Sequence, residues 1–414
     1  QAECFMPFKE SAVFCAPIKN VRVLADDEDK EGKTYLEFTF DITDNPINFL
    51  PGDTIAIIPQ NADEAVSSFL ELFRLGGMED VPYALSLHKS VQPGKRITLP
   101  MHLPRKSTLK QVFRDCISFK FPQKKQFYRM LHDYAEDFDK TTLKSLCGKD
   151  SKALETLLKS PDLSIIEFIK SLPSCRPPIV RFLENLCRLQ PKPYSIVNSP
   201  LWNKTELKIA LSIVKNRSGE TTRYLKKLSD MFLGGTKKPL NVWMYLRKPN
   251  TFRYTDNDFS KNIIMVGVGC AIAPFISFMQ HKAMLQHQGA HGYPGQAWLF
   301  VGFKKPDLAL FTNEIDEFLH DGIIDRAFES FSRETSQKQK YVQDHILENA
   351  KQFVDLLYQD TLLYVCADGS DICKSIETTI ETAIIHVLDC SYEEAQDTVA
   401  IFKSCGKYRQ DLWV

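Results

Sequence analysis

A glycine-rich turn behind a short apolar stretch is the first candidate for chemistry in this chain. Gly267, Gly269 and Cys270 follow directly after Ile263–Val266, and an apolar segment that ends at Phe275 comes next. A buried strand that leads through closely spaced glycines into a helix presents backbone N–H groups and a helix dipole to a pyrophosphate. Glycines in such turns can also serve packing alone, so nucleotide binding and packing are both open interpretations.

Three residues with different chemistry fall within four positions where an expected strand begins. Lys192 is a cation that could hold a phosphate, Tyr194 could pack against a flat ring, and Ser195 carries a hydroxyl. Because side chains alternate along a strand, Lys192 and Tyr194 are expected on one face and Ser195 on the other. The segment could therefore contact different parts of a long ligand, or it could be an ordinary strand of a barrel.

Hydroxyls and cations in two further segments also suit phosphate groups. Gly219, Thr221 and Thr222 stand where a helix is expected to begin, although a helix cap explains the threonines equally well. Ser332 and Arg333 follow an expected strand, at the edge where open α/β sheets bind ligands. A hydroxyl and a guanidinium there suit the 2′-phosphate that distinguishes NADPH from NADH, and a solvated charged loop is the alternative.

The remaining candidates are polar and aromatic residues at the ends of other expected elements. They are Lys340, Tyr341 and Gln343 at a helix start, Cys366 and Asp368 at a strand end, and Asp411 and Trp413 near the last residue. A buried cysteine is usually an inert apolar side chain, and a tryptophan can simply pack or can cover a flat cofactor. The nine histidines have no metal-ligand spacing, so we expect no metal site.

The elements that must position these residues fall into two regimes. The first mixes strands of alternating polarity, such as Tyr35–Asp41 and Leu207–Val214, with a helical stretch over 107–189. In the second, four apolar strand-like runs alternate with helical segments, which is typical of a doubly wound parallel sheet. We expect an antiparallel β-barrel over 1–70 and 186–236, an α-helical connecting domain over 71–185, a linker over 237–258, and an α/β doubly wound domain over 259–414.

Composition limits the partners of the chain. The 414 residues carry 52 Lys+Arg and 52 Asp+Glu, so no overall charge favours nucleic acid or an anionic membrane. No uncharged apolar run approaches the roughly 18 residues that a membrane span needs. Eleven cysteines without a Cys-x-x-Cys pair argue against a disulfide framework and favour a cytoplasmic setting.

Taken in their order, these segments resemble the ferredoxin–NADP⁺ reductase-like module of the diflavin reductases. The resemblance implies FAD binding by Lys192, Tyr194, Ser195, Gly219, Thr221, Thr222 and Trp413, with Trp413 shielding the flavin. It implies NADPH binding by Lys33, Gly267, Gly269, Cys270, Ser332, Arg333, Lys340, Tyr341, Gln343 and Asp368. It implies that Ser195, Cys366, Asp411 and Trp413 surround the contact between nicotinamide and flavin. Ala271 stands where the family has a third glycine, and its Cβ is expected to crowd the pyrophosphate.

Four segments point to one branch of that family. They are Thr98–Pro104, Ser174–Pro178, Leu189–Ser195 and Lys340–Asp344. The resemblance implies that electrons from NADPH pass through FAD, and then through FMN in a preceding domain supplied in cis or in trans, to the cobalamin of methionine synthase. The chain would then serve methionine biosynthesis and homocysteine metabolism. The alternatives are a diflavin reductase for another acceptor, such as a cytochrome, and a degenerate module that binds a partner without turnover.

Overall fold

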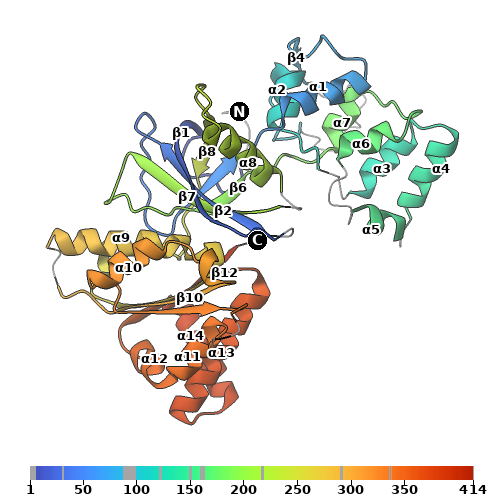
Figure 1. Cartoon of the computed structure of the whole chain (residues 1–414). Coiled ribbons are helices and arrows are strands. Elements are labelled where there is room, and N and C mark those ends of the chain that lie inside the picture. The colour runs from blue at the N-terminus through green and yellow to red at the C-terminus, as the bar shows by residue number, and fades with distance from the viewer. Residues whose placement is uncertain are drawn as a thin grey trace.

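The computed structural model describes residues 6–29, 32–86, 99–120, 124–148, 152–158, 164–215, 219–289, 292–334, 336 and 338–413. Figure 1 shows a barrel of strands in the middle, a group of blue-green helices to one side of it, and an orange-red α/β unit below it. This arrangement confirms the predicted fold class, an antiparallel β unit interrupted by helices and followed by a parallel-sheet α/β unit. None of the described helices is both long and apolar enough to cross a membrane.

The described residues of the barrel form a six-stranded sheet in the order β6-β3-β8-β1-β2-β7. The strands are β1 (Phe14–Asp26), β2 (Lys33–Asp41), β3 (Thr54–Ile58), β6 (Lys192–Ser195), β7 (Glu206–Val214) and β8 (Asn241–Leu246), and helix α8 (Glu220–Leu233) packs beside them. All strand pairs are antiparallel, and a bridge between Ile196 and Ile209 joins the two edge strands. Alternate side chains, such as Phe38 and Leu211, fill the interior.

Two predicted boundaries need correction. The sequence predicts a linker over 237–258, but β8 lies inside that range and pairs with both β1 and β3. Val242 and Met244, which alternate along β8, are buried against these two strands. Polar residues on either side of β8 make this strand hard to recognise in the sequence. The predicted barrel segment 1–70 also ends too late, because Phe69 and Leu70 belong to the core of the helical unit.

The helical unit has a core of its own. Its elements are α1 (Asp63–Leu72), β4 (Pro82–Ala84), β5 (Lys106–Thr108), α2 (Leu109–Asp115), α3 (Lys125–His132), α4 (Asp137–Leu146), α5 (Lys152–Leu158), α6 (Ile165–Lys170) and α7 (Ile179–Asn185). Phe69 lies at its centre, with ring centroids of Phe113 and Phe182 at 4.8 and 5.4 Å. Aromatic burial of this kind stabilises the unit separately from the barrel.

Beyond residue 259, the described residues form a five-stranded parallel sheet in the order β11-β10-β9-β12-β13. The strands are β9 (Asn262–Val268), β10 (Ala297–Phe303), β11 (Arg326–Phe331), β12 (Thr361–Asp368) and β13 (Tyr408–Trp413). The helices are α9 (Ala273–His287), α10 (Thr312–His320), α11 (Val342–Glu348), α12 (Ala350–Leu357), α13 (Ser370–Leu388) and α14 (Tyr392–Ser404), and the 3₁₀ turns are η1 (Asp256–Asp258), η2 (Gly269–Ile272) and η3 (Pro306–Leu308).

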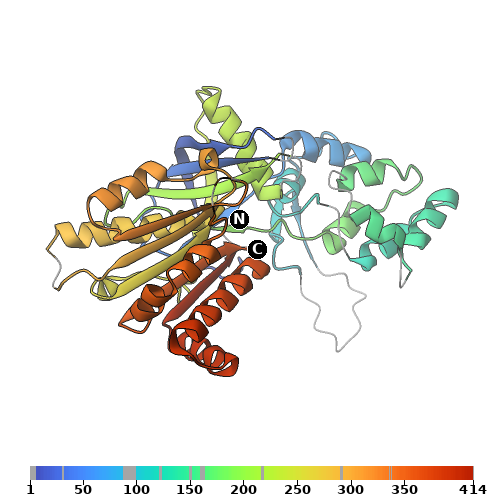
Figure 2. The ribbon, with the colours of Figure 1, turned by 60° about the horizontal axis from the view of Figure 1, so that its bottom comes forward.

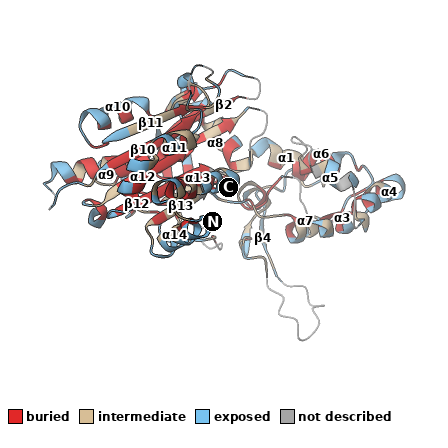
Figure 3. Ribbon diagram, turned by 90° about the horizontal axis from the view of Figure 1, so that it is seen from below, coloured by how far each residue is buried: buried red, intermediate tan, exposed pale blue. Residues whose placement is uncertain are grey.

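Alternation along the parallel strands separates two faces of this sheet. Met265 and Tyr364 join a core with α9 and with barrel residues such as Tyr35. Their neighbours, such as Ile264, face the core formed with α11 to α14. Figure 2 shows these helices lying along the strands, and Figure 3 shows buried positions concentrated where helices and strands meet. The α/β unit is therefore packed directly against the barrel, so residues of both units can share one site.

A hydrogen-bonded chain through the buried ring of His281 also joins these two units. Ser199, which follows the barrel strand β6, is 2.9 Å from Nδ1 of His281 in α9, and Nε2 of His281 is 2.8 Å from Asp256. Burial lowers the pKa of His281, and the Asp256 carboxylate opposes this shift only in part. A neutral ring with its proton on Nε2 satisfies both partners, because a carboxylate can only accept a hydrogen bond.

We expect this histidine to make stability depend on pH. Its folded pKa lies below the unfolded value near 6.5, so stability is full above that value and falls as the pH drops below it. Between pH 7.5 and 5.5, urea unfolding should show that His281→Gln loses less unfolding free energy than the wild type. The exposed His287 on the same helix is the control, and an equal effect of His287→Gln would contradict the prediction.

Candidate functional site

The carboxyl ends of β9 and β12 meet where the strand order of the parallel sheet reverses. Gly267 of β9 lies in register with Cys366 of β12, and Cys366 lies in register with Asp411 of β13. From the barrel, the hydroxyl of Ser195 approaches Oδ2 of Asp411 to 3.5 Å. The edge of an open α/β sheet at such a reversal is where ligands bind. Ser195, Cys366 and Asp411, distant in sequence, therefore form one group, here named the edge cluster.

The edge cluster combines a hydroxyl, a thiol and a carboxylate in a largely buried position. Ser195 is 2% and Cys366 0% exposed, whereas Asp411 is half-buried. A carboxylate in a place of low water content stabilises positive charge that develops beside it more strongly than it would in bulk water. The cluster can therefore favour a reaction in which a neutral ring becomes cationic, as a dihydronicotinamide ring does when it gives up a hydride.

Tyr194 and the first turn of α8 form a second part of the site. Tyr194 is 5% exposed, and its hydroxyl forms no well-aligned hydrogen bond among the described residues, although the hydroxyl of Thr222 lies close enough to interact with it. Burial raises the pKa of Tyr194 and the nearby Thr222 hydroxyl opposes the shift, so the phenol stays protonated. Because buried polar groups are normally satisfied, a phenol hydroxyl whose contact with Thr222 is this poorly aligned fits a ligand with acceptor atoms, such as a flavin nucleotide.

The start of α8 excludes the simple cap interpretation of the two threonines. The N-cap is Gly219, and no described side chain makes the cap hydrogen bond. Thr221 and Thr222 instead lie within the first turn and are buried. Lys192 is exposed, and its Nζ lies 5.8 Å from the ring centroid of Tyr194, as expected for two residues on one face of a strand. These groups together suit the phosphates and ring of FAD.

The two glycines of the turn are required for different reasons, Gly267 for packing and Gly269 for its backbone conformation. A Cβ on Gly267 would lie 2.9 Å from the ring of Phe275, so this glycine is required by packing. Gly269 has φ +60°, and a Cβ added to it would meet no described atom within 4 Å, which leaves space for a ligand. Cys270 and Ala271 are 9% and 1% exposed and belong to the apolar core. The expectation that Ala271 crowds a pyrophosphate is therefore wrong, because its side chain faces inward.

Ser332 and Arg333 lie directly after β11, as predicted. Their backbone N–H groups donate to the carbonyls of Phe303 and Lys304, which fixes the turn. The side chain of Arg333 is 53% exposed, and its Nη1 lies 3.6 Å from Oδ2 of Asp29 in the barrel. This acidic partner was not visible from the sequence, where residues around Asp29 look like a solvated turn.

Three of the predicted NADPH-binding residues, Lys340, Tyr341 and Gln343, stand at the start of α11. Lys340 and Tyr341 are exposed, and their backbone N–H groups both donate to the carboxylate of Asp344. The amide of Gln343 donates to the hydroxyl of Ser375 at 3.0 Å, which ties this helix to α13. Tyr341 therefore offers an accessible ring, whereas Gln343 already has a partner within the protein.

The other predicted residues are placed by the backbone alone or stand apart from the edge cluster. Lys33 begins β2 and is in register with Val214. The backbones of Asp368 and Trp413 are paired across β12 and β13. Their side chains, and with them the predicted shielding of a flavin by Trp413, lie outside the described part of the structure. Among the described residues, no group of three or more His, Cys, Asp or Glu side chains could hold a metal ion.

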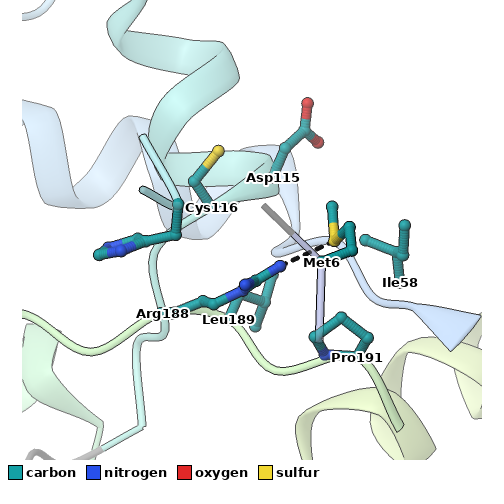
Figure 4. A pocket seen from close by; sticks show the side chains of 8 residues that line it. Met6, Ile58, Asp115, Cys116, Arg188, Leu189 and Pro191 are labelled. Atoms are coloured by element: carbon teal, nitrogen blue, oxygen red, sulfur yellow. Dashed lines mark hydrogen bonds between the residues drawn. The ribbon is translucent and has the colours of Figure 1, made fainter. Parts of the chain in front are cut away.

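A small pocket lies where the helical unit meets the barrel (Figure 4). It is lined by Met6, Ile58, His102, Asp115, Cys116, Arg188, Leu189 and Pro191. Burial and the nearby charge of Arg188 lower the pKa of His102 to about 4, so this ring is neutral at physiological pH. None of the predicted site residues lines this pocket, so we regard it as part of the joint between the two units.

Two family models match the two units that form this site. A family model described as the FAD binding domain matches residues 6–225, and one described as the oxidoreductase NAD-binding domain matches residues 265–370. Methionine synthase reductase of Homo sapiens is 32% identical over 431 residues, with 97% of this chain and 61% of the relative covered. The protein of that name from Rattus norvegicus is 30% identical, with coverages of 92% and 58%.

A relative named for a different electron acceptor is also similar to the chain. NADPH–cytochrome P450 reductase of Aspergillus oryzae is 28% identical over 437 residues, with 98% of this chain and 61% of the relative covered. The chain thus spans about three fifths of the length of these curated relatives. The shared part includes both the barrel and the α/β unit, which together provide the edge cluster.

Proposed function

The chain belongs to the diflavin reductase family of FAD- and NADP-binding oxidoreductases, and we propose that its edge cluster accelerates the reduction of FAD by NADPH. The observation that carries this proposal is the convergence of Ser195, Cys366 and Asp411 at the reversal point of the parallel sheet. Bound there, NADPH supplies a hydride and FAD accepts it, and the redox chemistry belongs to these cofactors. The protein contributes binding, orientation and charge.

Within this proposal, each unit holds a different cofactor. Tyr194, Thr222 and Lys192 of the barrel unit bind FAD through the phenol, the hydroxyl and the ammonium group. The turn at Gly269 admits the coenzyme pyrophosphate, and Arg333 takes the 2′-phosphate. Asp411 stabilises the positive charge on the nicotinamide, and the Ser195 hydroxyl orients that carboxylate.

We further propose that the electrons are destined for the cobalamin of methionine synthase, by way of an FMN domain in cis or in trans. The similarity to two methionine synthase reductases over at least 92% of this chain supports this acceptor. The similarity to a cytochrome P450 reductase supports a second candidate, a reductase for a cytochrome. A degenerate partner-binding module has less support, because Ala271 faces the core and leaves the turn at Gly269 open.

The first step can be tested with the chain as it stands. We expect the purified protein to bind about one FAD per chain, and the flavin absorbance to bleach faster with NADPH than with NADH under anaerobic conditions. Absorbance titration and stopped-flow spectroscopy measure both results. If folded protein retains no flavin absorbance after FAD has been added and the unbound FAD removed, the reductase proposal is rejected and a partner-binding module is favoured.

The acceptor requires a second measurement. With an added FMN domain and NADPH, the chain should restore the activity of methionine synthase whose cobalamin has been oxidised. Reduction of a cytochrome under the same conditions, without restored methionine synthase activity, would support the cytochrome candidate instead. Both assays use one preparation, so a difference between them reports the acceptor and not the state of the FAD.

A further inference from the structure

The end of the β1–β2 hairpin brings two carboxylates from the barrel onto cations of the α/β unit. Lys304 and Lys305 follow β10, and Arg333 follows the adjacent strand β11. Asp27 lies 3.3 Å from Nζ of Lys304, and Asp29 lies 3.9 Å from Nζ of Lys305 and 3.6 Å from Nη1 of Arg333. We name Lys304, Lys305 and Arg333 the basic edge.

Resting on the proposed use of NADPH, we propose that Asp29 is a coenzyme-selectivity residue that competes with the 2′-phosphate for the basic edge. In this role the carboxylate sits against Arg333 when no coenzyme is present. The 2′-phosphate must then displace it, or share the cations with it. Asp29 thereby lowers the affinity for NADPH without changing that for NADH, which carries no 2′-phosphate.

Hydrogen bonds within the hairpin hold Asp29 in this position. Its N–H donates to Oδ1 of Asp27 at 3.4 Å, and its carbonyl accepts from the N–H of Gly32 at 2.7 Å. A Cβ on Gly32 would overlap the carbonyl oxygen of Asp27, so the hairpin is closely packed here. That carbonyl oxygen also accepts from Nζ of Lys215 at 2.7 Å. The carboxylate of Asp29 is therefore presented by a defined backbone.

The two acidic residues have different roles. Asp27 is 3% exposed, and although burial opposes its ionisation, the hydrogen bond from Lys304 lowers its pKa overall. Because a buried carboxylate that loses its cationic partner is left uncompensated at high cost, Asp27 anchors the hairpin. The side chain of Asp29 is 57% exposed, as is 53% of that of Arg333, so this pair can open at little cost. Only the exposed carboxylate can yield to a phosphate.

Charge and geometry favour the phosphate once it arrives. A guanidinium binds phosphate through two parallel hydrogen bonds, whereas the 3.6 Å contact with Asp29 is longer than a hydrogen bond. A dianionic phosphate that shares the basic edge with Asp29 also meets a like charge. Removing the Asp29 charge eliminates both the competition and the repulsion, and it leaves all three cations in place.

The test compares binding of 2′,5′-ADP and 5′-AMP to the FAD-loaded full chain by calorimetry. Asp29→Asn should bind 2′,5′-ADP about 3- to 10-fold more tightly than the wild type, since exposed ion pairs and their repulsions are of this size. Binding of 5′-AMP should not change. The matched control is Glu28→Gln, which removes the same charge from an exposed neighbour that makes no ion pair among the described residues, and it should change neither affinity more than about 2-fold.

Two further arms identify the cause of the effect. In an Arg333→Ala background, Asp29→Asn should lose most of its gain, and higher salt should reduce the gain in the parent background. Weaker 2′,5′-ADP binding by Asp29→Asn, or a gain equal to that of Glu28→Gln, would overturn the proposal while leaving the reductase function intact. If neither the wild type nor any variant binds 2′,5′-ADP, both the proposal and the use of NADPH fail.

Discussion

Asp411→Asn is expected to slow the reduction of FAD by NADPH about 10- to 100-fold, while the bound FAD content stays the same. The substitution keeps the size of the side chain and removes the negative charge from a half-buried position beside Ser195 and Cys366. Loss of one preorganised electrostatic contact with a developing charge typically costs this much or more. Stopped-flow measurement of flavin bleaching at saturating NADPH reports the effect directly.

A matched variant separates the effect of net charge from the effect of a charge at position 411. Asp397 is exposed on α14, so Asp397→Asn changes the net charge equally without reaching the edge cluster. Its bleaching rate should stay within about 2-fold of the wild type. If both variants are slowed alike, or if Asp411→Asn is slowed only because it has lost FAD, the assigned role of Asp411 is wrong.

Local sequence patterns predicted most strands and helices, but they did not predict which elements lie next to one another in the folded protein. The alternation in Tyr35–Asp41 and the apolar run Ile263–Val266 correspond to β2 and β9. By contrast, β13 and α14 were missed. Polar residues interrupt the edge strand β13, and the apolar residues of α14 include the exposed Tyr392 and Ile401, so they do not mark one buried face. The same limit applies to β8, whose burial depends on pairing with strands more than 180 residues earlier in the chain.

The site shows the same division between local signals and tertiary contacts. Motifs indicated Ser195, Cys366 and Asp411 one at a time, but their meeting depends on how the barrel packs against the sheet. The approach of Asp29 to Arg333 has no local signal at all, because charged residues in a hairpin turn are usually solvated. The expectation for Ala271 was wrong for a related reason, since the sequence gives its Cβ but not the direction in which it points.

Gly52→Ala is expected to destabilise the protein by more than about 4 kcal/mol. Gly52 has φ +97°, and a Cβ there would overlap the carbonyl oxygen of Phe252. Moving the backbone at this point costs free energy, because the next residue, Asp53, is buried. Asp53 also accepts two hydrogen bonds from Arg253, of 2.5 and 2.7 Å. Left-handed strain and a backbone clash next to a buried, ion-paired carboxylate together belong among the largest single-residue effects.

A second glycine separates the clash from the strain. Gly77 has φ +84° but no described atom within 4 Å of an added Cβ, so Gly77→Ala should cost only about 1–2 kcal/mol. Thermal and urea unfolding of both variants measure the difference. Arg253 also accepts hydrogen bonds at its carbonyl from Tyr364 and Arg409 of the α/β unit. Gly52→Ala should therefore loosen the contact between barrel and α/β unit, and it should slow flavin reduction even where the chain remains folded. Equal costs for the two glycines would show that the turn at Gly52 can shift, and that this junction does not set the geometry of the edge cluster.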